Sequence, residues 1–359
     1  MLVGIPAEVK NRETRVALTP SGASELVALG HDVVIQAGAG VGSMIPDQDY
    51  VDAGARIGSV DEAWGAELVL KVKEPVPEEY GRLGTQTLFT FLHLAANRPL
   101  ADALTSAGTT ALSLDTVQLA DGSLPLLAPM SAVAGRLAAL AGGYHLLSSE
   151  GGPGILMGGI PGVPRAATVV IGAGVAGTNA VQLLSAMGAG VTVLDLSEER
   201  LRRIDAENLP GVTTVVSTPE AVDAAVTEAD LVVGAVLVPG HTAPKLVSHE
   251  QVSRMRQGSV LVDIAIDQGG CFEDSRPTTH DDPVYVVEHS VFYCVANMPG
   301  AVGATSTAAL THVTLPYIKA LVGGVDSAIA ADAALAAGLN VAGGRVVHPV
   351  VARAFPDLA

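Results

Sequence analysis

The chain has 359 residues, a formal net charge of −17 and only 2 cysteines. This length favours two domains, each large enough to bury its own core. An acidic balance argues against nucleic acid and anionic membranes as partners, since both select basic surfaces. Two cysteines are too few for a disulfide framework and fit a reducing compartment, so we expect a cytoplasmic protein.

The hydrophobic pattern does not predict a membrane segment. The most apolar stretches are shorter than the ~20 residues of a spanning helix or are broken by Gly, Pro and polar residues. The N-terminus begins like a strand and reaches Glu8 and Lys10 at once, so no signal peptide is expected.

The first 128 residues alternate between strand and helix patterns. Residues 2–6 predict a strand, and Thr19-Pro20 predicts a helix start over 21–29, because Thr caps a helix and Pro fits its first turn. Further elements are expected as strands at 31–37, 68–73, 87–92 and 109–114, and as helices near 47–53, 60–65 and 99–107. Such alternation is typical of an α/β domain with a largely parallel sheet.

A second α/β pattern follows a long, Ala-rich helical stretch at 131–147. Strands are expected at 191–195, 212–216, 231–235, 259–264, and 284–287 or 292–296. A second long helix, 305–321, is expected to return the chain to the first domain, with short helices and turns over 324–359. The predicted fold is α/β, with two Rossmann-like domains of parallel sheet joined by long helices. Domain 129–304 would be inserted into a discontinuous domain of residues 1–128 and 305–359, leaving a cleft between two lobes.

A glycine-rich turn opens the inserted domain. An apolar strand enters a G-x-G-x-x-G turn at 172–177, and a helical pattern follows. Gly172 would permit the tight turn, Gly174 would let a pyrophosphate approach the backbone, and Gly177 would let helix pack on strand. Asp195 ends the next strand, about 20 residues on, where a ribose-binding carboxylate is expected. An ordinary glycine turn with a surface Asp is the alternative. The acid, with no Arg directly after it, favours NAD over NADP.

Basic side chains lie after strands of the first domain. Arg15 could grip a carboxylate with two hydrogen bonds, although a solvated loop Arg is the alternative. Lys71 and Lys73 share one face of an apolar strand, where a buried ammonium needs an anion or a substrate oxygen. An edge strand with solvated lysines is equally open. His93 ends the strand 88–92 and suits proton transfer, although a hydrogen-bonded structural His is equally common.

Two polar residues follow strands of the inserted domain. Asp267 comes after the strand 259–265, and Asn297 follows 291–296. Each alone is a plausible loop cap, but together they would surround the place where a nicotinamide projects. Cys271 and Cys294 lie in apolar surroundings, which favours inert core thiols over a nucleophile. No metal site is expected, because the histidines show no metal-ligand spacing and no paired C-x-x-C appears.

Segments spread over nearly the whole chain resemble the bacterial alanine dehydrogenase family, which includes transhydrogenase alpha subunits. They are residues 4–8, 15–20, 71–75, 90–95, 127–131, 172–177, 238–240, 262–270 and 295–300. The resemblance implies a two-domain, NAD-dependent enzyme, usually a hexamer, that interconverts L-alanine with pyruvate and ammonium.

The resemblance also implies roles for individual residues. Arg15 would hold the substrate carboxylate, Lys73 would polarise the carbonyl or carbinolamine oxygen, and His93 would be the acid/base. Asp267 would assist at the amine and nicotinamide side, and Asn297 would contact the substrate. The NAD site would be lined by Ser131, Val175, Asp195, Ile264, Asp267, Asn297 and Met298.

The chain departs from the family pattern at two places, and several other functions stay open. Ala132 stands where relatives often carry Glu, and Gly303-Ala304 replace a more usual Pro and basic residue. Both lie where a long helix begins, which puts hinge stiffness and subunit contacts in question.

The alternatives to an alanine dehydrogenase are the soluble NAD-binding part of a proton-translocating transhydrogenase, a dehydrogenase for another small amino acid, and a silent NAD-binding protein.

Overall fold

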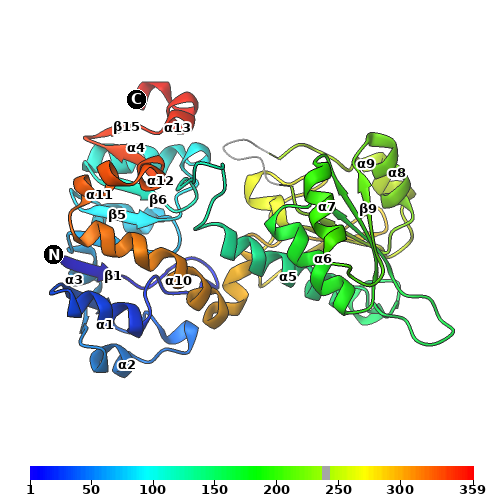
Figure 1. Ribbon diagram of the computed structural model, residues 1–359, viewed down its shortest axis with the longest axis horizontal. Helices are drawn as coiled ribbons and strands as arrows, with labels where there is room; N and C mark the ends of the chain where they lie inside the picture. Colours follow the sequence, from blue (N-terminus) through cyan, green and yellow to red (C-terminus); the bar gives the residue numbers. More distant parts are fainter. Residues whose placement is uncertain (237–242) are drawn as a thin grey trace. The chain divides into compact units, whose positions relative to one another are not determined.

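The structure is a computed structural model that describes residues 1–236 and 243–359. The described residues form two compact α/β units (Figure 1). Unit 1 comprises residues 1–130 and 300–359, and unit 2 comprises residues 131–299. The chain leaves unit 1 within helix α5 (Ala128–His145) and returns to it within the short helix η6 (Met298–Val302).

Unit 1 contains an eight-stranded sheet in the order β15-β14-β6-β5-β4-β1-β2-β3. Its strands are β1 (Leu2–Ile5), β2 (Asp32–Gln36), β3 (Arg56–Gly58), β4 (Leu68–Leu70), β5 (Thr87–Thr90), β6 (Thr110–Ser113), β14 (Leu339–Ala342) and β15 (Arg345–Val346). Strands β1 to β6 pair in parallel, and β1 lies between β2 and β4. The chain therefore changes direction across the sheet between β1 and β4, where open α/β sheets bind ligands beyond the carboxyl ends of their strands.

The end of the chain extends this sheet. The sequence analysis expects short helices and turns over 324–359, and short helices are present there, but it missed the strands β14 and β15. Strand β14 pairs antiparallel with β6, placing Leu339 opposite Leu112, and β15 pairs antiparallel with β14. The sheet of unit 1 is thus mixed at this edge and parallel elsewhere.

Helices cover both faces of the sheet in unit 1. They are α1 (Pro20–Ala28), α2 (Asp47–Asp52), α3 (Val60–Trp64), α4 (Arg98–Ala107), α10 (Gly303–Val322), α11 (Val325–Ala331), α12 (Ala333–Ala337) and α13 (Pro349–Ala354), with short helices η1 (Val41–Ser43), η2 (Pro77–Arg82), η3 (Leu94–Ala96) and η7 (Pro356–Leu358). One core contains Leu26 of α1 and Leu310 of α10. The core on the other face contains Trp64 of α3 and Leu104 of α4. As the sequence predicts, the Thr19 side chain accepts a hydrogen bond from Gly22 N at the start of α1.

Unit 2 contains a seven-stranded sheet in the order β12-β13-β11-β10-β7-β8-β9. Its strands are β7 (Ala167–Ile171), β8 (Gly190–Asp195), β9 (Val212–Val216), β10 (Leu231–Gly234), β11 (Val260–Asp263), β12 (Val284–Val287) and β13 (Ser290–Tyr293). All pair in parallel except β12, which forms an antiparallel pair with β13. The sequence left 284–287 and 292–296 as alternatives, and the structure has a strand in each region.

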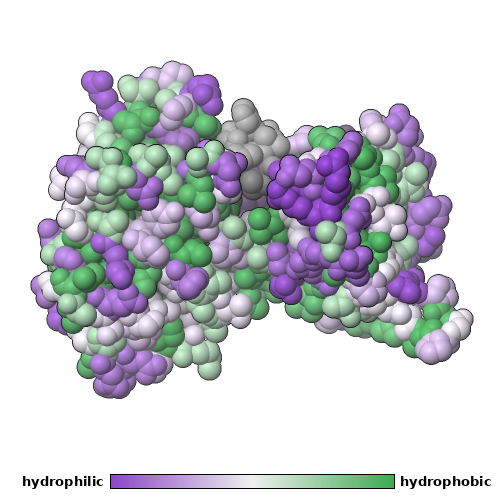
Figure 2. All heavy atoms as spheres, viewed as in Figure 1, coloured by the Kyte–Doolittle hydropathy of each residue, from purple (hydrophilic) through white to green (hydrophobic). Residues whose placement is uncertain are grey.

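The helices of unit 2 are α5, α6 (Val175–Ala186), α7 (Glu198–Ala206), α8 (Pro219–Thr227) and α9 (His249–Arg254), with short helices η4 (Ser148–Glu150) and η5 (Ile264–Gln268). One core packs Ala139 and Ala180 against Val170 of β7. The other packs Val226 and Val252 around Leu261 of β11. The outer face of α7 is charged (Figure 2), with exposed ion pairs that join Glu198 to Arg202 and Glu199 to Arg203.

Among the described residues, no single helix is long and apolar enough to cross a membrane. One bent pair, Met298–Val322 with Val325–Ala331, satisfies the same length and composition test when taken together, with a bend of 117°.

Candidate active site

Unit 1 brings three of the predicted site residues to one edge of its sheet. Arg15, Lys73 and His93 follow β1, β4 and β5, and these three strands are neighbours in the order β5-β4-β1. Because the strands are parallel, their carboxyl ends meet at the same edge. The segments that carry these three side chains therefore leave the sheet at the same edge, with Arg15 farther along its loop than Lys73 and His93.

Arg15 is buried and held by a carboxylate. Its side chain is 2% exposed and that of Glu13 is 0% exposed. Arg15 Nε donates to Glu13 Oε1 at 2.7 Å, and Nη2 donates to Glu13 Oε2 at 2.5 Å. On its other side, Nη1 lies 3.1 Å from the sulfur of Met130. The alternative of a solvated loop Arg is wrong, and Glu13 fixes the plane of the guanidinium.

The backbone around Arg15 is clamped by other parts of unit 1. Val16 N donates to Thr307 Oγ1 of α10 at 3.0 Å, and Ser43 Oγ donates to Thr14 O at 2.8 Å. Gly303, at the start of α10, lies against Thr14, so that a Cβ there would come within 2.3 Å of Thr14 Oγ1. This contact gives a physical reason for glycine at one of the two departures from the family pattern.

Lys71 and Lys73 are both buried, but only Lys71 has partners. Strand β4 has neighbours on both sides, so the edge-strand alternative is wrong. Lys71 Nζ lies 3.0 Å from Glu8 Oε2 and 3.0 Å from Glu79 Oε1. Lys73 is 7% exposed, and no residue that the structure describes forms a hydrogen bond or ion pair with its ammonium. A buried ammonium in this state is available to a substrate oxygen.

His93 lies at the end of β5 in an unusual backbone conformation. Its φ and ψ are 46° and 38°, in the left-handed region. The imidazole stacks on Phe91 with an interplanar angle of 5°, and its side chain is 33% exposed. Nδ1 lies 3.6 Å from Asp115 Oδ2. The ring is therefore held on two sides and reaches solvent, as a proton-transfer group requires.

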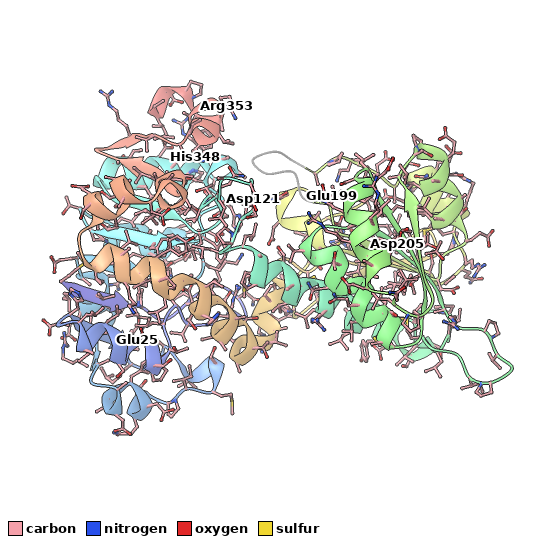
Figure 3. All side chains as sticks on the ribbon, in the orientation of Figure 1. Glu25, Asp121, Glu199, Asp205, His348 and Arg353 are labelled. Atoms are coloured by element: carbon pink, nitrogen blue, oxygen red, sulfur yellow. The ribbon has the colours of Figure 1, made fainter. Side chains whose placement is uncertain are left out.

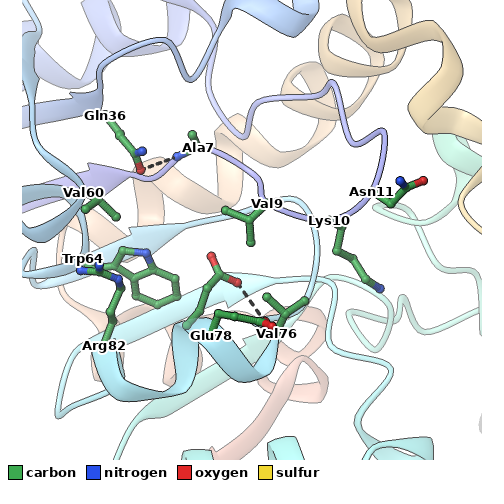
Figure 4. Close-up of a pocket in the computed structure, with 11 residues that line it drawn as sticks. Ala7, Val9, Lys10, Asn11, Gln36, Val60, Trp64, Val76, Glu78 and Arg82 are labelled. Carbon is green, nitrogen blue, oxygen red and sulfur yellow. Dashed lines mark hydrogen bonds between the residues drawn. The ribbon is translucent and has the colours of Figure 1, made fainter.

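A pocket of about 550 Å³ opens elsewhere on unit 1 (Figure 4). It is lined by residues from the ends of β1 and β2, from α3 and from η2: Ala7, Val9, Lys10, Asn11, Gln36, Val60, Trp64, Val76, Glu78, Glu79 and Arg82. Arg15, Lys73 and His93 are not among them, so this pocket is not the predicted substrate site.

In unit 2 the glycine turn joins β7 to α6 and fits a bound dinucleotide. A Cβ on Gly177 would lie 1.7 Å from Gly172 O, so only glycine allows α6 to pack this closely on the turn. Gly172 has φ +103°, which favours glycine. A Cβ on Gly174 would meet no atom within 4 Å, so open space lies beside the N-terminus of α6. That space and the N–H groups of the first turn suit a phosphate.

Asp195 ends β8 beside the glycine turn. Its Oδ2 accepts from Ala173 N at 2.6 Å and its Oδ1 accepts from Ser197 N at 2.7 Å. Its side chain is 8% exposed, and Arg200 Nη1 lies 3.6 Å from Oδ2. The carboxylate thus holds the turn directly, with lone pairs left for ribose hydroxyls. Sequence analysis missed Arg200, because it is brought to Asp195 by the first turn of α7.

Asp267 lies in η5, directly after β11, and its side chain is exposed. The loop that carries it is organised by buried Asp263, which accepts from Ala265 N at 3.0 Å and Cys271 N at 2.8 Å. Burial raises the pKa of Asp263, although these hydrogen bonds oppose the effect. Lys245 Nζ also clamps the loop by donating to the carbonyl oxygens of residues 269, 270 and 272.

The remaining predicted cofactor residues also lie in unit 2. Asn297 has φ +68° and follows β13, its carbonyl oxygen 3.1 Å from His280 Nε2. Met298 is 3% exposed and packs in the core. Val175 is exposed at the start of α6, while Ser131 on α5 and Ile264 on η5 are half-buried. The segment 238–240 lies outside the described residues.

The two cysteines lie in the hydrophobic core of unit 2. Both thiols are free and buried, and burial raises the pKa of Cys271 and raises that of Cys294 to about 11, which disfavours the reactive thiolate. Within residues 1–236 and 243–359, no group of three or more His, Cys, Asp or Glu side chains could hold a metal ion.

The sequence analysis missed Glu13, Asp115 and Asp263, three carboxylates that hold predicted site residues or their loops. Asp115 and Asp263 both lie at the end of a strand, at the carboxyl edge where ligands bind. Both could have been predicted as candidates from the sequence, because each is a polar residue at or just after the end of an expected strand. Glu13 could have been found from its position two residues before Arg15.

Both parts of the chain match known protein families. Residues 4–134 match the family "Alanine dehydrogenase/PNT, N-terminal domain", and residues 138–349 match "Alanine dehydrogenase/PNT, C-terminal domain". The chain is 57% identical to alanine dehydrogenase of Mycolicibacterium smegmatis over 98% of its own length and 96% of that protein. A solved L-alanine dehydrogenase is 48% identical, with a TM-score of 0.96 over 100% of both chains. A transhydrogenase from Sinorhizobium meliloti is 28% identical, with a TM-score of 0.81 over 97% of this chain and 99% of that one.

Proposed function

We propose that the chain, which belongs to the alanine dehydrogenase/PNT family, oxidises L-alanine to pyruvate and ammonium and catalyses the reverse reaction. It is an oxidoreductase acting on the CH–NH2 group, and its family implies a nicotinamide nucleotide cofactor. The observation that carries the substrate proposal is the buried Lys73 ammonium, which has no partner among the described side chains and stands at the same sheet edge as Arg15 and His93.

We propose NAD as the cofactor. The N-terminus of α6, with open space at Gly174, would receive the pyrophosphate, and Asp195 would accept from the ribose hydroxyls. A carboxylate at this position repels a 2′-phosphate. Val175, Ile264, Met298 and Ser131 would complete the contacts to NAD.

Arg15, Lys73 and His93 would bind the amino acid and its product. Glu13 holds the Arg15 guanidinium through Nε and Nη2, and Arg15 would bind the substrate carboxylate. Lys73 would hydrogen-bond the oxygen of pyruvate. Asn297 would contact the substrate, and Asp267 would assist at its amine.

In the oxidative direction a bound nicotinamide nucleotide would supply the hydride acceptor for Cα of alanine, and the residues of unit 1 would act on the iminium carbon and its protons. His93 would then take a proton from the water that adds to the iminium carbon. Lys73 would hold the new oxygen of the carbinolamine. The His93 imidazolium would give its proton to the carbinolamine nitrogen and then take the proton of the hydroxyl group as the C–N bond breaks. The ammonia released would take that proton from His93 and become ammonium, and pyruvate would remain. Proton transfer of this kind contributes about 10²–10⁴-fold to the rate.

We also propose a cytoplasmic homo-oligomer, a hexamer by family resemblance. The two free, buried thiols fit a reducing compartment. Light scattering of the purified protein would then give a mass about six times the 36.3 kDa of one chain.

A substrate and cofactor panel tests the function. The purified chain is assayed for reduction of NAD or NADP with L-alanine, glycine and L-serine, and for oxidation of NADH or NADPH with L-lysine plus 2-oxoglutarate. We expect alanine with NAD to give the highest kcat/KM. Asp195 would accept hydrogen bonds from the ribose hydroxyls, so Asp195→Ala should weaken NADH binding about tenfold, or about 1.4 kcal/mol. The substitution should also raise the use of NADP relative to NAD.

The same panel separates the alternatives. Hydride exchange between NADH and an NADP analogue, without any amino acid, would instead support a transhydrogenase component. Cofactor binding without turnover would indicate a silent NAD-binding protein. An unchanged NAD preference in Asp195→Ala would show that Asp195 acts only on the fold of the turn.

A further inference from the structure

Asp115 lies beside His93 because their strands are neighbours. Strands β5 and β6 pair in parallel, with Thr90 opposite Ser113, so the residues that follow the two strands emerge side by side. Asp115 Oδ2 lies 3.6 Å from His93 Nδ1. This distance is longer than a hydrogen bond, but such contacts often tighten only when the substrate is bound.

The Asp115 carboxylate is fixed by hydrogen bonds to its other oxygen. Oδ1 accepts from Leu92 N at 3.0 Å, from His93 N at 3.4 Å and from the hydroxyl of Ser113. Burial acts to raise the pKa of Asp115, but the His93 charge, the Ser113 hydroxyl and the two amides together hold it below its ordinary value. Asp115 is therefore an ionised group whose Oδ2 faces the imidazole.

The His93 ring is fixed from the opposite side as well. It stacks on Phe91 with ring centroids 6.1 Å apart. Its left-handed backbone, with φ 46°, is unfavourable for a residue other than glycine and is the kind of strain that collects at functional sites. In this conformation the backbone N–H of His93 donates to Asp115 Oδ1 at 3.4 Å.

We propose that Asp115 is a positioning residue for His93: it keeps a proton on Nδ1, so that Nε2 is the atom that takes the proton from the attacking water. The proposal rests on the proposed function. The proton passes from water to Nε2, the ring becomes an imidazolium, and Asp115 stabilises that charge without itself becoming protonated. The same logic holds a catalytic imidazole in one tautomer in other enzymes.

Other charged groups around the pair are few in the described chain. Lys73 follows the neighbouring strand β4, and Arg98 on α4 is engaged with acids of its own. His348 and Arg353 lie on the C-terminal segment, at the start and on the body of α13 (Figure 3). Burial lowers the pKa of His348. The negative charge of Asp115 partly opposes this lowering, and the positive charge of Arg353 adds to it.

The test compares two substitutions at Asp115 with a matched control. In Asp115→Asn the amide oxygen can still accept from the backbone, but the amide nitrogen presents a donor to Nδ1 and forces the wrong tautomer. Asp115→Glu keeps the charge. Asp121→Asn removes a carboxylate from the exposed loop that follows β6, where Asp121 bonds only Ser123 among the described residues (Figure 3).

We expect Asp115→Asn to lower kcat for alanine by about 100-fold, with NADH binding within about twofold of wild type. The acid limb of its kcat/KM profile should move about one unit to lower pH, because the negative charge facing the ring is gone. Asp115→Glu should recover kcat to within about tenfold, and Asp121→Asn should match wild type. An unchanged kcat in Asp115→Asn, a loss with an unshifted profile, or equal losses in the Asn and Glu variants would each overturn the proposal.

A second readout does not depend on turnover. Diethylpyrocarbonate acylates the neutral imidazole, and mass spectrometry of the peptide that carries His93 follows its rate against pH. The midpoint should move to lower pH in Asp115→Asn and stay in place in Asp121→Asn, whereas an unmoved midpoint in Asp115→Asn overturns the pairing. If wild type did not oxidise alanine and the midpoint still moved, the proposed function would fail while the pairing would stand.

Discussion

Lys71 and Lys73 are separated by one residue and buried to a similar degree, yet their surroundings differ. Lys71 is neutralised by Glu8 and Glu79. Burial acts to lower the pKa of Lys71, but the two carboxylates outweigh it and raise the pKa above its ordinary value. Lys73 has no counterion among the described residues. The first lysine therefore contributes to the fold, and the second is held at a cost to stability, which we propose a substrate oxygen would offset.

Because the surroundings of the two lysines differ, replacing each with Met should change the free energy of unfolding in opposite directions. Lys73→Met should raise the free energy of unfolding by about 1 kcal/mol and lower kcat/KM for pyruvate at least about 100-fold, because it removes both the desolvated charge and the contact to the substrate oxygen. Lys71→Met should lower the free energy of unfolding by about 3–5 kcal/mol, because two buried carboxylates lose their partner. Urea unfolding and steady-state kinetics measure both. Similar destabilisation in the two variants would contradict this interpretation.

At the level of single residues, the sequence alone predicted which side chains form the candidate site, but not which residues hold them. The type and strand-end position of Arg15, Lys73 and His93 were visible, while their burial was not, because burial depends on strand order. Solvated alternatives for Arg15 and Lys73 stayed open until β1 and β4 were known to be interior strands. The pairing of Asp115 with His93 depends on the register of β5 and β6, which local sequence does not specify.

At the scale of elements, hydrophobic pattern and turn chemistry predicted the interior strands and the long helices. These segments are long or strongly apolar, so the pattern is strong. Strand β3 has 3 residues, and β15 has 2, which is too short for alternation to be visible. Strand β14 contains Asn340 and follows a helix-like Ala-rich run, and it becomes a strand only by pairing with β6.

The turn between β7 and α6 offers a matched pair of glycines. Gly174→Ala places a methyl group in open space at the N-terminus of α6, so the protein should fold with a Tm within about 2 °C of wild type and lose NADH affinity at least about tenfold. Gly177→Ala places a methyl group 1.7 Å from Gly172 O, so the helix must shift and the Tm should fall by several degrees.

Thermal unfolding and fluorescence titration with NADH test the pair. Normal NADH affinity in Gly174→Ala would show that the phosphate does not use this space. An unchanged Tm in Gly177→Ala would show that the close packing of α6 on the turn is not needed for stability.

At the scale of the whole molecule, the similarity to alanine dehydrogenases extends over nearly every residue, so departures from the family pattern are local. Gly303 is explained by its contact with Thr14 beside Arg15. Nothing in the structure explains Ala132. Both units carry their predicted residues at the carboxyl edge of a sheet, one set suited to a small carboxylic acid and the other to a dinucleotide.

We propose that His93 performs the proton transfer in the oxidation of alanine. Alanine-dependent NADH formation by His93→Ala, followed by absorbance at saturating NAD and alanine, tests it most directly when NADH binding is titrated on the same sample. We expect kcat to fall about 10²–10⁴-fold while the Kd for NADH stays within about twofold of wild type. A kcat close to wild type in a variant that binds NADH normally would contradict it.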